Sequence, residues 1–262
     1  MFGKTIRILF FSFLFLASLS LLQACASTHQ SNKQRSAELK MEIGVSHLQR
    51  NNLPLALKEL LGALELDPKN PYVQNNLGIV YFLREKYDLS VKYFTEAVNL
   101  SPSFTEAKNN LARVYIEQKQ YSKATRLLDE VLADLTYTNA HSAYFNYGLL
   151  YFNQNKYDQA KVYLSKILNE NREDCYTQVY YARSLMETKF TKLAAEQLDK
   201  ATQFCVREQV DDAHFYGAIA YYRIGNKQKA LARFEELVKI FSEGKHRAKA
   251  SEMIQLIQKE KK

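Results

Sequence analysis

The sequence predicts an all-α protein whose helices stack as an internal repeat. Glycine and proline are scarce, at 8 and 4 of 262 residues, which disfavours a turn-rich all-β fold. Hydrophobic residues make up 47% of the chain, which is enough for an extensive ordered core. Small residues recur with a period of 34, and this period is the strongest signal in the chain.

The first 24 residues are typical of a lipoprotein signal peptide. A basic start without acids precedes an uncharged run over 8–22, which is too short to span a bilayer comfortably and has the length of a signal-peptide core. The tetrapeptide that ends at Cys25 (LQAC) resembles the lipobox cut by the lipoprotein signal peptidase. We therefore expect a signal peptide over 1–24 and a lipid on Cys25; the alternative is a chance cysteine behind an ordinary signal peptide.

A lipid on Cys25 would anchor the chain to a membrane, because several acyl chains anchor stably where one does not. Ala26 follows the cysteine, which under the usual Gram-negative sorting rule implies the outer membrane, with the folded body facing the periplasm and the leaflet left open. Residues 25–36 read as the lipidated cysteine and a flexible polar tether. The net charge of +8 is spread along the chain among acids, which argues against nucleic-acid binding.

A period of 34 residues runs through the body of the chain. Three sets of residues are spaced by it: Gly44, Gly78 and Ala112; Ala56, Ser90 and Ala124; Pro68 and Pro102. After an insertion of two residues the small residue returns at Gly148 and Ala182, and after two more at Ala218. Such spacing indicates structural units that bury their apolar faces by stacking on one another.

The pattern resembles the tetratricopeptide repeat, a pair of antiparallel helices. In the second unit the signature positions of that family are filled by Leu77, Gly78, Tyr81, Tyr87, Ser90, Phe94, Ala97 and Pro102. The resemblance implies a right-handed superhelical solenoid whose first helices line a concave face. It covers six units, over 37–70, 71–104, 105–138, 141–174, 175–208 and 211–244, followed by a capping helix over 245–262.

Each unit needs small residues where its two helices touch. Gly or Ala at position 8 and Ala or Ser at position 20 allow close approach, and large apolar residues at positions 7, 11 and 24 fill the space around that contact. Pro68 and Pro102, at position 32, end the second helix of their units.

No constellation of catalytic or metal-ligating residues is visible in the sequence. The five histidines are scattered without an i,i+4 pair or an acid at ligand spacing, which argues against a metal site. A Gly-rich phosphate loop, a Gly-x-Ser-x-Gly motif and a catalytic Cys–His pair are not found either. We therefore expect no enzyme, no cofactor besides the covalent lipid and no small-molecule substrate; the rival is an enzyme subunit that uses the repeats as a specificity arm.

Cys175 and Cys205 occupy positions 1 and 31 of the fifth unit. In an antiparallel pair the start of the first helix lies beside the end of the second, so we predict a disulfide between them. The alternative is two buried thiols that do not meet.

The first helices of the first two units carry an apolar stripe. It consists of Met41, Val45, Leu48, Tyr72, Ile79 and Phe82. This stripe is more hydrophobic than a solvated surface requires, so we predict a groove for an apolar partner peptide or helix. The alternative is contact with the neighbouring helix or the N-terminal segment.

Position 6 carries asparagine in three consecutive units, at Asn76, Asn110 and Asn146. A row of primary amides, which both donate and accept, would pair with the backbone of an extended peptide. The alternative is chance, since Asn is common on helix surfaces. No lysines stand at positions 2 and 5 of the second and third units, so we do not expect capture of a C-terminal carboxylate.

Beyond the repeats, the chain resembles the pilotin lipoproteins of type IV pili. Three details carry this resemblance: the stretch over 44–52 (GVSHLQRNN), the insertion over 134–137 (DLTY), and the NYGL motif over 146–149 with Tyr157 and QAK over 159–161. The resemblance implies that the groove of the first two units holds a secretin subunit and promotes its localisation and assembly. The alternative is a periplasmic adaptor for outer-membrane protein assembly or for a peptidoglycan hydrolase complex.

Overall fold

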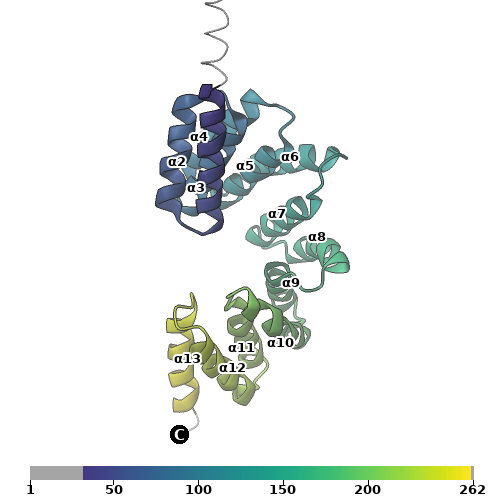
Figure 1. Ribbon diagram of the computed structural model, residues 1–262. Coiled ribbons are helices and arrows are strands. Elements are labelled where there is room, and N and C mark those ends of the chain that lie inside the picture. Colours follow the sequence, from purple (N-terminus) through teal and green to yellow (C-terminus); the bar gives the residue numbers. More distant parts are fainter. Residues whose placement is uncertain (1–31, 261–262) are drawn as a thin grey trace, which may run out of the picture. The chain divides into compact units, whose positions relative to one another are not determined.

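The computed structural model describes residues 32–260, and the regular secondary structure in that range is entirely helical, which confirms the predicted all-α class (Figure 1). Its first helix covers residues 32–49. The helices that follow are α2 (Leu53–Leu66), α3 (Pro71–Leu83), α4 (Tyr87–Leu100), α5 (Thr105–Glu117), α6 (Tyr121–Ala133), α7 (Ala140–Asn153), α8 (Tyr157–Glu170), α9 (Cys175–Glu187), α10 (Thr191–Arg207), α11 (Asp212–Arg223), α12 (Lys227–Ile240) and α13 (Arg247–Lys259).

The helix over 32–49 extends further toward the N-terminus than the sequence suggested. Residues 32–36, which the polar composition places in the flexible tether, are helical and exposed, and the Ser36 hydroxyl donates to the carbonyl of Asn32 at 2.9 Å. The physical reason lies in the next residue, Ala37, which is fully buried. Once packing has formed the helix there, adding polar residues to its N-terminal end is easier than starting a new helix. The predicted signal peptide over 1–24 and Cys25 lie outside the described residues.

The chain forms two compact units, one up to Val114 and one from Tyr115, so the division falls inside α5. In the first unit α2 packs on α3, and α3 packs on α4 (Figure 1). In the second unit each helix from α6 to α13 packs on the next. Contacts of α9 with α7 and with α11 also bring the first helices of successive repeats together.

Position 8 of a repeat is where its two helices come closest. A Cβ atom added to Gly78 would lie 2.6 Å from ring atoms of Phe94, and one added to Gly148 would lie 2.5 Å from Leu164 Cδ2. The residue at position 20 takes part as well, because the hydroxyl of Ser90 donates to the carbonyl of Gly78 at 2.8 Å. A side chain added at Gly78 or Gly148 would therefore push the two helices of that repeat apart.

The turn between the two helices of each repeat depends on one residue in the left-handed conformation. This residue stands at position 15 and has a φ between 55° and 80° in Asn51, Glu85, Lys119, Asn155, Lys189 and Gly225. The N–H of the next residue bonds to the carbonyl five positions back, as from Lys86 to Tyr81 at 2.9 Å, which is the pattern of a Schellman motif. Because five of these residues are not glycine, composition does not reveal the turns.

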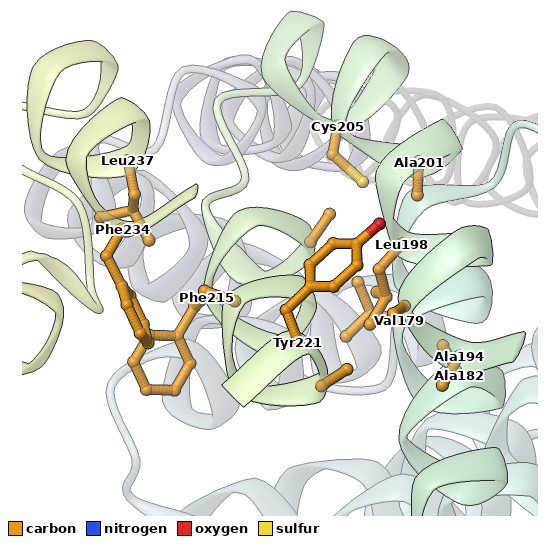
Figure 2. Packing of buried hydrophobic residues seen from close by; sticks show 14 of the residues in the cluster. Val179, Ala182, Ala194, Leu198, Ala201, Cys205, Phe215, Tyr221, Phe234 and Leu237 are labelled. Atoms are coloured by element: carbon orange, nitrogen blue, oxygen red, sulfur yellow. The ribbon is translucent and has the colours of Figure 1, made fainter. Parts of the chain in front are cut away.

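A continuous hydrophobic core runs through the C-terminal part of the second unit. Figure 2 shows Phe215 and Tyr221 of α11 between two groups of side chains from neighbouring helices. Leu237 and Phe234 of α12 lie on one side, and Leu198 of α10 lies on the other (Figure 2). The last helix joins the same core through Ala250 and Ile257, which are fully buried. The face of α13 that carries these two residues therefore caps the array.

The structure joins Cys175 and Cys205 in a disulfide. Cys175 is the first residue of α9, Cys205 lies in the last turn of α10, and their Cα atoms are 5.2 Å apart. Both side chains are buried in the core of the second unit. The bond ties the two ends of the fifth repeat together.

His214 is a titratable group buried beside this core. Its side chain is 1% exposed, and Nδ1 has no hydrogen-bond partner. Burial lowers the pKa of His214 and outweighs the opposing charge of Glu236, whose carboxylate lies 3.8 Å from Nε2. The folded protein therefore favours the neutral imidazole.

Adding a methyl group at Gly78 tests the close helix contact. Gly78→Ala overlaps the Phe94 ring, and overpacking of this kind lowers the free energy of unfolding by about 1–3 kcal/mol, measured by urea titration. Gly217→Ala in α11 is the matched control, because its new Cβ would meet only Leu198 Cβ, at 3.4 Å. The helix propensity of alanine should make that change neutral or stabilising. If both variants lost the same free energy of unfolding, the overlap with Phe94 would not be the cause.

Removing the disulfide should lower stability substantially. The bond closes a loop with a sequence separation of 30, for which the chain-entropy model gives about 3–4 kcal/mol. We expect dithiothreitol to lower the urea midpoint of the wild type to that of a variant carrying both Cys175→Ala and Cys205→Ala. The double variant, as its own control, should not respond to the reductant. A wild-type midpoint that does not change on reduction would show that the bond does not stabilise the fold.

The buried His214 predicts a loss of stability in mild acid. Because its pKa in the folded state lies below the ordinary value of about 6.5, the unfolded chain binds the proton more readily. The stability that the neutral imidazole contributes is fully present above about pH 6.5 and declines as the pH falls below the ordinary pKa. Urea titrations between pH 7.5 and pH 5 should show a smaller decline in His214→Phe than in the wild type. An equally steep decline in His214→Phe and in the wild type would show that another group is the source.

Candidate functional site

The apolar stripe of the first unit is only partly open to solvent. Met41 and Leu48 pack against the hydrophobic core of the first repeats. Val45 and Ile79 are half-buried. Tyr72 is the exposed member, at 58%, and its ring centroid lies 4.9 Å from that of Phe104. Contact with neighbouring helices therefore accounts for part of the stripe.

Phe82 closes the stripe at the other end of α3. Its ring contacts that of Tyr87 at 5.8 Å, and the guanidinium of Arg113 lies 5.7 Å from the ring centroid. The half-buried and exposed members that remain are apolar and aromatic. They form a small apolar surface. Burying an apolar side chain of a partner against it is favourable, because both surfaces are removed from water.

The three asparagines do not form the predicted row of free amides. Asn110 donates from Nδ2 to Oδ1 of Asn75 at 3.1 Å, so the pairing runs through position 5 of the preceding repeat rather than through Asn76. Asn76 itself is half-buried. Asn146 belongs to the second unit and is only 5% exposed, which makes it a core residue rather than a groove residue. The amide of Asn110 therefore serves the contact between two neighbouring first helices.

The first helices of the second unit carry a face that the sequence analysis did not examine. Along it the ring of Phe152 of α7 lies 5.2 Å from that of Tyr180 of α9 in an edge-on arrangement. Arg183 stands among these rings and lies 4.3 Å from the ring centroid of Tyr216 of α11. The sequence shows aromatic residues at these places, but only the packing brings them around one cation.

Asp211, Asp212 and His246 form the one cluster in residues 32–260 whose ligand atoms lie close enough to hold a metal ion, all within 4.8 Å of one another. The sequence analysis missed this cluster because the two acids and the histidine are 34 or more residues apart. Internal bonds explain it: Asp211 Oδ2 accepts from the backbone N–H of His246 at 2.7 Å, and Asp212 Oδ1 lies 3.2 Å from His246 Nε2. The cluster fastens the start of α13 to the start of α11.

The pKa of Asp212 fits this structural role. Burial opposes its ionisation, but the hydrogen bond with His246 and the charge of Lys245 outweigh burial and hold the pKa of Asp212 below its ordinary value. The carboxylate therefore stays charged and bonded.

The strongly shifted phenols of the second unit also serve structure. Burial and a hydrogen bond to Asp199 raise the pKa of Tyr221 to about 12. Asp199 in turn pairs with Arg233 at 2.8 Å. Burial and a bond to Asp129 raise the pKa of Tyr147 in the same way. A phenol with a raised pKa is a poor base near neutral pH, so these groups tie helices together rather than suit proton transfer.

Family models match most of the repeat array. The models described as TPR repeat and tetratricopeptide repeat cover residues 44–84, 81–143, 141–174 and 212–243, together more than half of the chain. The fifth repeat, which contains the disulfide, lies outside these matches. A comparison with curated protein sequences finds no significant match.

Solved structures share the fold over nearly the whole described chain. PilF of Pseudomonas aeruginosa is 22% identical with a TM-score of 0.66, covering 87% of this chain and 99% of its own. PilW, a type IV pilus biogenesis factor, is 20% identical with a TM-score of 0.72, covering 85% and 98%. A tetratricopeptide repeat protein from Parabacteroides merdae is 16% identical with a TM-score of 0.68, covering 85% and 84%.

Over residues 32–260 no helix has the length and hydrophobicity to span a bilayer.

The family and the geometry both indicate a protein-interaction module. Tetratricopeptide arrays present the side chains of their first helices to protein partners, and both units carry an apolar or aromatic surface there. The chain is a tetratricopeptide repeat protein that resembles the pilus biogenesis proteins PilF and PilW in fold.

Proposed function

We propose that this protein is an outer-membrane lipoprotein, anchored through Cys25, whose periplasmic repeats bind a secretin subunit and promote its assembly for type IV pilus biogenesis. The observation that carries the proposal is the combination of a lipobox before Cys25 with a repeat array that aligns with 99% of PilF and 98% of PilW. Neither the anchor nor the array alone points to this role.

The surface proposed to receive the secretin is the open part of the apolar stripe in the first unit. It comprises the exposed ring of Tyr72 and the half-buried side chains of Val45 and Ile79. A partner helix or strand with apolar side chains at matching spacing buries its own apolar surface there. No charge is needed for this mode of binding.

The first arm of the test concerns the anchor. The native envelope is solubilised, and the protein and whatever co-purifies with it are recovered from the wild type and from Cys25→Ser. We expect a secretin in the wild-type sample and a fall in heat-resistant secretin multimers in the Cys25→Ser strain. Recovery of an outer-membrane assembly protein or a peptidoglycan hydrolase, with secretin multimers unchanged, would contradict the proposal and favour the adaptor role.

The second arm concerns the surface. Ile79→Glu places a charge on the stripe, which should abolish secretin recovery because burying an unpaired carboxylate is costly. Leu89→Glu is the matched control, since Leu89 is 41% exposed on α4, a second helix of the same unit. Helix content measured by circular dichroism should be the same in both variants. Normal secretin recovery by a folded Ile79→Glu variant would remove the stripe from the proposal.

A further inference from the structure

Arg183 is held in a frame of aromatic rings in the second unit. Its guanidinium lies 4.3 Å from the ring centroid of Tyr216, 4.6 Å from that of Phe152 and 5.0 Å from that of Tyr180. These rings come from three successive first helices, α11, α7 and α9. Each cation–π contact of this kind is worth about 0.5–1 kcal/mol at an exposed site, so the three together restrict where the guanidinium lies.

The N–H groups of this guanidinium are not used within the fold. Within residues 32–260 Arg183 donates no hydrogen bond and forms no ion pair. Other arginines of the same unit do: Arg207 pairs with Glu173 at 3.0 Å, and Arg223 pairs with Glu187 at 2.7 Å. Arg183 is half-buried, so part of its side chain is open to solvent.

Asp212, the acid whose pKa the charge of Arg183 helps to lower, already has other partners. Asp212 feels the charge of Arg183, but its Oδ1 lies 3.2 Å from His246 Nε2 and 3.7 Å from Lys245 Nζ. His246 and Lys245 thus already pair with this carboxylate. The guanidinium of Arg183 therefore forms no ion pair within residues 32–260.

An apolar hollow opens beside the frame. Its volume is about 270 Å³, and Phe145, Ile167 and Tyr176 supply its apolar lining. Tyr176 is 51% exposed, and Phe145 connects the hollow to the frame because its ring meets that of Tyr180 edge-on at 5.8 Å. The hollow has room for an apolar side chain.

The hollow and the cation have a defined spacing. Tyr176 and Arg183 lie on α9 seven residues apart, which places them two turns apart on one face and about 10 Å apart along the axis. An extended peptide rises about 3.3 Å per residue, so it spans that distance in about three residues.

We propose that this face binds an extended segment of a protein partner that carries an apolar side chain and, about three residues away, an Asp or Glu carboxylate. The apolar side chain enters the hollow, and the carboxylate accepts a forked pair of hydrogen bonds from Arg183, whose position the ring contacts already restrict. This site lies in the second unit, and it stands whether or not the partner of the first unit is a secretin.

A random dodecapeptide library displayed on phage, panned against the full-length chain in detergent micelles, provides the probe. We expect enriched peptides to carry an acid three positions from an aromatic or aliphatic residue. For a synthetic copy of the best peptide, Arg183→Gln should raise the Kd at least tenfold, measured by fluorescence anisotropy. Replacing the acid of the peptide by its amide should do the same with the wild-type protein, and combining both changes should add little. This peptide arm keeps the test valid if the protein variant fails to fold.

The matched control is Arg207→Gln, which removes another arginine of the fifth repeat and should change the Kd by less than twofold. Arg183→Lys keeps the charge without the planar fork and should fall between wild type and Arg183→Gln. Enriched peptides without an acid, or equal binding by wild type and a folded Arg183→Gln, would overturn the proposal. Binding lost in Ile79→Glu and retained in Arg183→Gln would also overturn it, while leaving the proposed function of the first unit intact.

Discussion

The close contact between the two helices of each repeat is the constraint on which the rest of the structure depends. At Gly78 and Gly148 the facing side chain already occupies the place that a Cβ atom would take. Because the helices approach this closely, large residues such as Phe94 and Leu164 are buried in the contact. The outward faces of the first helices are then positioned by the backbone rather than by loops, and this makes them suitable as binding surfaces.

Most of the fold follows from local sequence, because the two helices of a repeat are close in sequence and each repeat packs on its neighbours. The period of 34 and the small residues at positions 8 and 20 indicate where helices pair, and the structure has helices at those places. The left-handed turns cannot be predicted from the sequence, because Glu85 and Lys119 are not typical residues for that conformation. The helix over 32–36 escapes it too, because its residues are polar and only its continuation is packed.

The candidate sites were harder to predict, since they depend on contacts between repeats. Asn110 stands at the expected position, but its amide is taken by Asn75, and this pairing depends on the offset between adjacent first helices. The pair formed by Asp212 and His246 joins residues 34 positions apart in sequence, and Arg183 meets rings from three helices. Periodicity identifies the face on which a residue lies, whereas the rotamers and neighbours that decide its chemistry come from the packed structure.

The left-handed turns have a consequence for the unfolded chain. A residue other than glycine pays a conformational cost of about 1–2 kcal/mol at such a position, but it also restricts the unfolded backbone, which offsets part of that cost. The side chains of Glu85, Lys119 and Lys189 are exposed at their turns. Their chemical identity therefore contributes little to folding, and these turns are points where a spectroscopic label or a crosslinker can be attached without disturbing the helix pair beneath.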